Sequence, residues 1–136
     1  MWQPIPRLYH GIADASFVPA VATAPETVGF TEEPIATTLC RAISAGTMIS
    51  GLITKAEWGA VPVMPFKAHV ALDLAIGVFS LAAPWAFGFA QNTKARNTFL
   101  AMGAVGLVVG LLTQVDEMDP EKERILRLKA DALPAL

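Results

Sequence analysis

The most constraining stretch of the chain is the apolar run from His69 to Phe89, HVALDLAIGVFSLAAPWAFGF, which carries a single charged residue, Asp73. A helix needs about 20 mostly apolar residues to cross the hydrocarbon core of a bilayer. The apolar side chains of this run occupy every face of a helix, and a chain of 136 residues cannot bury them all in one soluble core. The run therefore predicts a transmembrane helix.

The composition agrees with a membrane protein. Hydrophobic residues make up 54% of the chain and charged residues 16%, whereas soluble domains carry about 25% charged residues. The formal net charge of −2 provides no basic field for a nucleic acid. We therefore expect the lipid bilayer, and no nucleic acid, as a partner.

An ungapped internal repeat runs through the chain with an offset of 59 residues. The aligned pairs include residue types that chance rarely matches: Pro6 with Pro65, His10 with His69, Asp14 with Asp73, Pro25 with Pro84, Gly29 with Gly88, Phe30 with Phe89 and Thr54 with Thr113. The two units cover about residues 6–54 and 65–113. Each predicts two helices, at Leu8–Val28 and Ile35–Thr54 and again at His69–Phe89 and Thr98–Val115.

The sequence thus predicts an all-α integral membrane protein with four transmembrane helices, built as two tandem helical hairpins with pseudo-twofold symmetry. The predicted transmembrane domain covers residues 1–115. Most cationic residues would lie on one side of the bilayer: Arg7, Lys55, Lys67, Lys122, Arg124, Arg127 and Lys129. The positive-inside rule then places both termini in the cytoplasm.

Residues 116–136 predict a cytoplasmic tail with a short amphipathic C-terminal helix. Asp119 can cap this helix, Pro120 can start it, and Glu123 with Arg127 can form an i,i+4 ion pair. The apolar positions Ile125, Leu128 and Ala132 share one face, with Leu126 and Leu133 beside it. Such a helix lies on the membrane surface or on a partner; a frayed, solvated tail is the alternative.

Two further groups of residues have predicted structural roles. Small residues that let a neighbouring helix approach closely are expected at Gly46, Gly51, Gly103, Gly106 and Gly110. Interfacial positions are expected at Trp58, Pro84, Trp85 and Phe89.

Arg41 is an unusual residue for a membrane helix, and its repeat counterpart is Leu100. Folding the first hairpin brings Arg41 close to the depth of Glu26, which is also specific to the first unit. We expect an intramembrane ion pair between them near the outer interface, because each charge lowers the burial cost of the other. Alternatively, Arg41 extends outward or meets an acidic group of another subunit.

The segment APWAFGF, preceded by the H-x-x-x-D pattern of His69 and Asp73, resembles the SPW-repeat family of small bacterial membrane proteins. The resemblance spans Pro6 to Thr113 in two copies. The second copy fits better, although Ala83 replaces the serine, and the first copy has Ala-Pro-Glu where the motif has Ser-Pro-Trp. The resemblance implies a fold with two transmembrane helices per repeat and a multi-pass location in the bacterial inner membrane, but no established activity.

The two H-x-x-x-D pairs are the residues that could carry chemistry. His10 and Asp14 share one helix face, as do His69 and Asp73. On the structural interpretation, each pair satisfies polar groups near the start of its helix. On the functional interpretation, the two histidines bind a haem or a chlorophyll-type pigment, and the aspartates orient the rings. No separate metal site and no firmly expected cofactor follow from the sequence.

Three classes of function remain. The absence of catalytic motifs and the small size favour a non-catalytic accessory or scaffold subunit of a larger membrane complex, such as a respiratory or photosynthetic one, rather than an enzyme. The alternatives are a haem- or pigment-binding protein that uses His10 and His69, and a small transporter or channel. Other membrane subunits are the expected partners, and a homodimer is also open.

Overall fold

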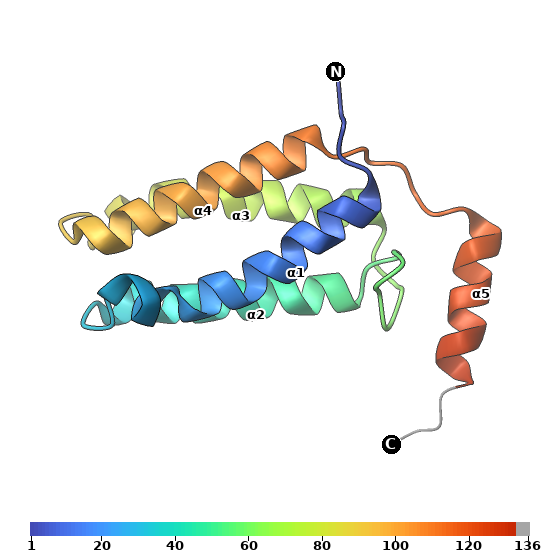
Figure 1. The fold of residues 1–136 in the computed structure, drawn as a ribbon, viewed down its shortest axis with the longest axis horizontal. Coiled ribbons are helices and arrows are strands. Elements are labelled where there is room, and N and C mark those ends of the chain that lie inside the picture. The colour runs from blue at the N-terminus through green and yellow to red at the C-terminus, as the bar shows by residue number, and fades with distance from the viewer. Residues whose placement is uncertain (133–136) are drawn as a thin grey trace.

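The computed structural model describes residues 1–132 as a helical protein, with no β-strand in that range. Its helices are α1 (Arg7–Ala24), α2 (Pro34–Leu52), α3 (Phe66–Ala86), α4 (Thr93–Leu112) and α5 (Pro120–Asp131), and a π-helical turn, Pro25–Gly29, continues α1. Figure 1 shows α1 to α4 as a bundle, with α5 set apart at the end where the N-terminus lies.

Three of the helices, α2, α3 and α4, are long and apolar enough to cross a membrane. Helix α1 does not meet that description, because Arg7, His10 and Asp14 lower the mean hydropathy of its 18 residues. Large apolar side chains on the outer faces of the helices are exposed, among them Val78 on α3 and Val108 on α4. Such an exterior is compatible with lipid and not with water.

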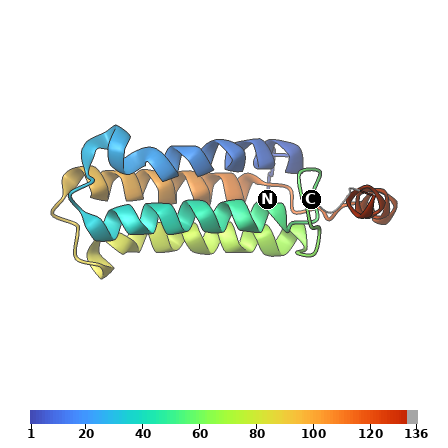
Figure 2. The same cartoon turned by 90° about the horizontal axis from the view of Figure 1, so that it is seen from below.

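The four long helices lie side by side (Figure 2), with α1 packed mainly on α2 and α3 mainly on α4. The predicted division into two hairpins is therefore present in the packing. The hairpins meet through α1 with α4 and α2 with α3. Buried residues from all four helices form the core, including Val21, Cys40, Ala83 and Phe99.

The helices begin and end earlier than hydropathy predicts. Helix α3 starts at Phe66, directly after Pro65, and α4 starts at Thr93, where the Asn92 side chain accepts a hydrogen bond from the N–H of Ala95. Proline and N-cap residues set these starts, whereas an apolar run marks only the part of the helix inside the hydrocarbon. In the turns that follow α1 and α3, Gly29 and Gly88 adopt φ of 84° and 77°, a conformation that favours glycine.

The predicted packing glycines divide into two groups. Gly103 and Gly110 of α4 lie against α3, since an added Cβ would approach Gly77 O and Leu74 Cδ2, respectively, to 2.7 Å. Gly106 also faces α3. Gly51 lies 3.9 Å from the Trp58 indole nitrogen, whereas Gly46 has no atom within 4 Å of an added Cβ.

The tail forms the predicted helix α5, which Asp119 caps by accepting from the N–H groups of Glu121 and Lys122. The predicted pair is also present, with Arg127 Nη2 2.7 Å from Glu123 Oε1. Helix α5 is held to the bundle end by an ion pair from Lys55 to Glu123 and by a hydrogen bond from Arg127 to the carbonyl of Pro62. Ile125 and Leu128 remain exposed; the predicted contribution of Leu133 lies outside the described residues.

Candidate functional site

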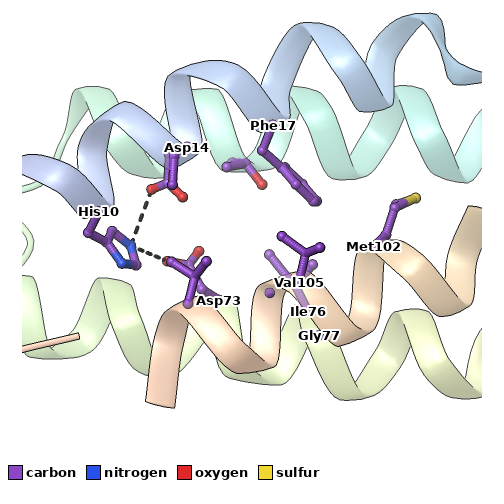
Figure 3. A pocket seen from close by; sticks show the side chains of 12 residues that line it. His10, Asp14, Phe17, Asp73, Ile76, Gly77, Met102 and Val105 are labelled. Atoms are coloured by element: carbon purple, nitrogen blue, oxygen red, sulfur yellow. Dashed lines mark hydrogen bonds and ion pairs between the residues drawn. The ribbon is translucent and has the colours of Figure 1, made fainter. Parts of the chain in front are cut away.

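The two H-x-x-x-D patterns converge on one cluster between the hairpins. His10 and Asp14 lie in the first turns of α1, and His69 and Asp73 lie at the corresponding place in α3. Because residues four apart share a helix face, each helix presents one histidine and one aspartate to the other. Figure 3 shows His10 in contact with both Asp14 of its own helix and Asp73 of the other hairpin.

The shortest contacts of the cluster run between the hairpins, not within them. His10 Nε2 lies 3.0 Å from Asp73 Oδ2, and His69 Nε2 lies 2.8 Å from Asp14 Oδ2. The contacts within each helix are longer, at 3.4 Å for His10 with Asp14 and 3.1 Å for His69 with Asp73. This corrects the structural interpretation of two separate pairs: all four residues form a single cluster, which we call the His–Asp cluster.

Two threonines bind the other nitrogen of each histidine. His10 Nδ1 lies 2.8 Å from Thr113 Oγ1, and His69 Nδ1 lies 3.0 Å from Thr54 Oγ1. Each threonine hydroxyl donates its only proton to a backbone carbonyl, that of Val109 for Thr113 and that of Ser50 for Thr54. Each threonine oxygen must therefore accept from the histidine, so both histidines carry a proton on Nδ1.

The threonines leave both Nε2 atoms directed at carboxylate oxygens. A neutral histidine protonated on Nδ1 has a lone pair on Nε2. A lone pair facing a carboxylate at hydrogen-bond distance is repulsive unless a proton or a cation lies between the two atoms. The cluster is therefore arranged to hold positive charge between the two helices.

The His–Asp cluster is shielded from solvent at the sides and open on one face. The side chains of His10 and His69 are 1% and 0% exposed, while those of Asp14 and Asp73 are 19% and 11% exposed. The Phe66 ring stacks on His69 at 6.0 Å and meets His10 edge-on at 5.5 Å. This aromatic lid keeps water from the histidines and strengthens the electrostatics of the cluster.

A cavity of about 40 Å³ adjoins the open face of the cluster. Its polar end is made by His10, Asp14, Asp73 and Thr47, and apolar side chains line the remainder, including Phe17, Ile76, Met102 and Val105 (Figure 3). The cavity thus leads from the carboxylates into the apolar space between α1, α3 and α4.

Ionic contacts close the same end of the bundle outside the cluster. Arg7 binds Glu57 through two hydrogen bonds of 2.9 Å, and Lys122 lies 2.8 Å from the same carboxylate. The Arg7 guanidinium, together with Lys122, lowers the pKa of Glu57 to about 2. Glu117 accepts from the N–H groups of Phe66 and Lys67 and so caps α3.

The remaining predicted site residues are not part of the cluster. Glu26 and Arg41 are in contact, as expected, and their side chains are about half exposed at 51% and 46%. Of the predicted interfacial residues, Trp85 is 60% exposed, but Pro84 and Phe89 are buried. Trp58 packs over Gly11 at the cluster end of the bundle. Phe89 is buried because the turn after α3 folds its ring against Phe99, 5.0 Å away.

Sequence reasoning missed the partners of the cluster. Thr54 and Thr113 are aligned by the repeat, and this match at the ends of the two units was the available signal. Glu117 and Phe66 carry no such signal, because their roles depend on how the tail and the start of α3 meet in space.

No family model, no curated protein and no solved structure compared with this chain matches it. The resemblance to the SPW-repeat family therefore stays a prediction that rests on the sequence motifs alone.

Proposed function

We propose that this chain is a bacterial inner-membrane protein that crosses the bilayer four times and serves as a non-catalytic accessory subunit of a larger membrane complex. The proposal includes the pseudo-twofold relation between the two hairpins and a cytoplasmic location for both termini. It rests on the repeat, on the packing of the four helices and on one face of α2 that remains open.

The fourth crossing is supported by the surroundings of Asp14. This residue lowers the apolar character of α1, and a carboxylate that faced lipid would be costly. In the bundle Asp14 faces the His–Asp cluster, where it contacts His69. Helix α1 also lies beside α2 and α4 along the bundle. With its carboxylate directed inward, α1 can cross the membrane as its repeat counterpart α3 does.

The pseudo-twofold relation is supported by contacts that occur in matching pairs. His10 binds Thr113, and His69 binds Thr54. The segments before the first helix of each unit also match, since Ile5 forms a β-bridge with Thr113 and Met64 forms one with Thr54. The start of the first unit thus lies against the end of the second unit, and the start of the second unit lies against the end of the first.

The observation that carries the accessory role is the environment of Gly46. The glycines of α4 are in close contact with α3, but an added Cβ at Gly46 meets nothing within 4 Å. Its neighbours on the same exposed face of α2 include Ala42 and Ala45. Small residues in membrane helices allow close approach of another helix, so we assign this face to a helix of a partner subunit.

The alternatives receive less support from the geometry. In a haem or chlorophyll-type pigment site, each Nε2 binds the metal ion at the centre of a large ring. Here the Nε2 atoms of His10 and His69 instead face carboxylate oxygens at 3.0 and 2.8 Å. The adjoining cavity of about 40 Å³ has room for only a few water molecules. A transporter needs polar groups along its path, and the cavity lining becomes apolar beyond Thr47.

The accessory role is tested by the native mass of the complex that a tagged copy brings out of its own membranes in mild detergent. We expect a large assembly of fixed stoichiometry for the wild type, and its loss in Gly46→Leu. Ala104→Leu is the matched control, because Ala104 occupies the repeat position of Ala45 on an exposed face of α4. A wild-type monomer or homodimer would contradict the accessory role.

A further inference from the structure

We propose that His10, Asp14, His69 and Asp73 bind one divalent first-row transition-metal ion, with Zn²⁺ as the best match to the ligand set. This site goes beyond the accessory role and does not depend on it. The sequence alone predicts no metal site, because each His–Asp pair supplies only two ligands. The fold brings the two pairs together and so supplies four.

The four ligand atoms lie close enough together to surround one tetrahedral ion. All four lie within 4.8 Å of one another, and the His–Asp separations range from 2.8 to 3.4 Å. For Zn²⁺ at about 2.0–2.2 Å from nitrogen and oxygen ligands, neighbouring ligand atoms of a tetrahedron lie about 3.4 Å apart. To surround the ion, the His–Asp separations would lengthen by up to a few tenths of an ångström, and ligand-atom separations that approach 4.8 Å would shorten.

The threonines prepare both histidines for this role. A histidine that binds a metal through Nε2 usually donates its Nδ1–H to an oxygen, which fixes the ring and raises its basicity. Thr113 and Thr54 accept these protons at 2.8 and 3.0 Å, and the carbonyls of Val109 and Ser50 hold the hydroxyls in the accepting orientation. The same arrangement occurs on both sides of the cluster.

Charge balance favours a divalent ion. Two carboxylates and two neutral imidazoles carry a total charge of −2, which one divalent cation neutralises. A neutral assembly is the least costly form in an apolar environment. A ligand set of two imidazoles and two carboxylates suits zinc, whereas magnesium and calcium prefer ligand sets made of oxygen atoms only.

The proposed metal would be structural, not catalytic. Four protein ligands complete a tetrahedral zinc site and leave no open position for substrate. Two ligands come from each hairpin, so the ion would join the halves of the bundle. The side chains of Asp14 and Asp73 are 19% and 11% exposed, so the ion would reach the cluster from the side of the carboxylates.

The competing arrangement has a proton on each Nε2, donated to the facing carboxylate. This metal-free cluster satisfies the same hydrogen bonds, and it is the outcome that would overturn the proposal. The two arrangements differ in whether the folded protein takes up a metal ion with defined stoichiometry.

The test uses the full chain in mild detergent, purified with a tag that contains no histidine and treated with a chelator. Co²⁺ is the first probe, because tetrahedral Co²⁺ absorbs strongly in the visible range and Zn²⁺ can then displace it. We expect one Co²⁺ per chain with a tetrahedral spectrum, and a higher melting temperature after Zn²⁺ addition.

Two variants and one control make the result specific. Asp14→Asn replaces an anionic carboxylate ligand with a neutral amide and should weaken Co²⁺ binding by more than about 10-fold. Thr113→Val removes the hydroxyl that accepts from His10 and should weaken binding by about 10- to 100-fold. Glu26→Gln makes the same carboxylate-to-amide change at the opposite end of the bundle and should leave binding unchanged. Circular dichroism checks that each variant is folded.

The proposal is overturned if folded wild-type protein takes up no Co²⁺, or if Asp14→Asn binds it as tightly as the wild type does. Should Asp14→Asn fail to fold, Thr113→Val and the wild-type stoichiometry still decide. Equal binding by the wild type and Thr113→Val, or binding without a tetrahedral spectrum, would also count against the site.

Discussion

Two threonine hydroxyls decide which histidine nitrogens face the carboxylates. Thr54 and Thr113 each donate their hydroxyl proton to a carbonyl of the preceding helical turn and accept a hydrogen bond from a buried imidazole. A hydroxyl that accepts and donates in this way cannot be replaced by an isosteric apolar group without leaving a buried N–H unpaired. The contribution of these threonines therefore comes from hydrogen bonding and not from volume.

Thr54→Val should lower the free energy of unfolding by about 1–3 kcal/mol, because the Nδ1–H of His69 would lose its acceptor in a buried site. The measurement is unfolding in detergent micelles, followed by circular dichroism. Thr98→Val is the matched control, because Thr98 also donates to the carbonyl four residues back, but in an exposed hydrogen bond. Equal effects of the two substitutions would contradict the proposed role of Thr54.

Glu57 makes stability depend on acid pH. Its pKa is lowered to about 2 from an ordinary value of 4.5, chiefly by the hydrogen bond from Arg7. Since the folded-state pKa is the lower one, the stabilisation is present above pH 4.5 and is lost as the pH falls toward 2. Glu57→Gln should therefore flatten the acid side of the stability profile, measured as melting temperature against pH. Glu32→Gln, at an exposed carboxylate, should leave the profile as it is.

At the level of helices, the same residue type has opposite roles in α2 and α4. An added Cβ at Gly103 would lie 2.7 Å from the carbonyl oxygen of Gly77, a backbone atom that cannot move aside easily. At Gly46 an added Cβ meets only open space. The sequence predicts both as packing glycines, because a pattern of small residues does not state which neighbour they face.

Gly103→Ala should destabilise the isolated chain by about 1–3 kcal/mol through overpacking between α3 and α4. Gly46→Ala should leave it unchanged or slightly stabilise it, because alanine restricts the unfolded chain more than glycine does. The melting temperatures of both variants in detergent give the comparison. Destabilisation by Gly46→Ala equal to that by Gly103→Ala would contradict the packing described.

For the whole molecule, the sequence was sufficient for the helices and insufficient for the site. Apolar runs predict α2, α3 and α4, and the cap at Asp119 predicts α5. The repeat brings His10 and His69 into register, but it cannot tell whether His10 contacts Asp14 or Asp73. That distinction depends on how the hairpins pack, as do the burial of Phe89 and the cap that Glu117 places on α3.

Four crossings can be separated from three by labelling with a membrane-impermeant maleimide. The only native cysteine, Cys40, is buried and can be replaced by alanine. Single cysteines at the exposed positions Trp2 and Glu32 then flank α1. We expect them to be labelled from opposite faces, with Glu32→Cys reached from the outside. Labelling of both from the same face would show that α1 does not cross.

The central claim is that one polar cluster joins the two hairpins, and a double-mutant cycle between His69 and Asp14 tests it most directly. These residues lie 55 positions apart in the sequence and 2.8 Å apart in the cluster. Unfolding of His69→Gln, Asp14→Asn and the double variant would be measured with a chelator present, so that no metal contributes. We predict a coupling free energy of about 1–3 kcal/mol. Effects that add to within about 0.5 kcal/mol would show that the residues do not interact, and would contradict the account.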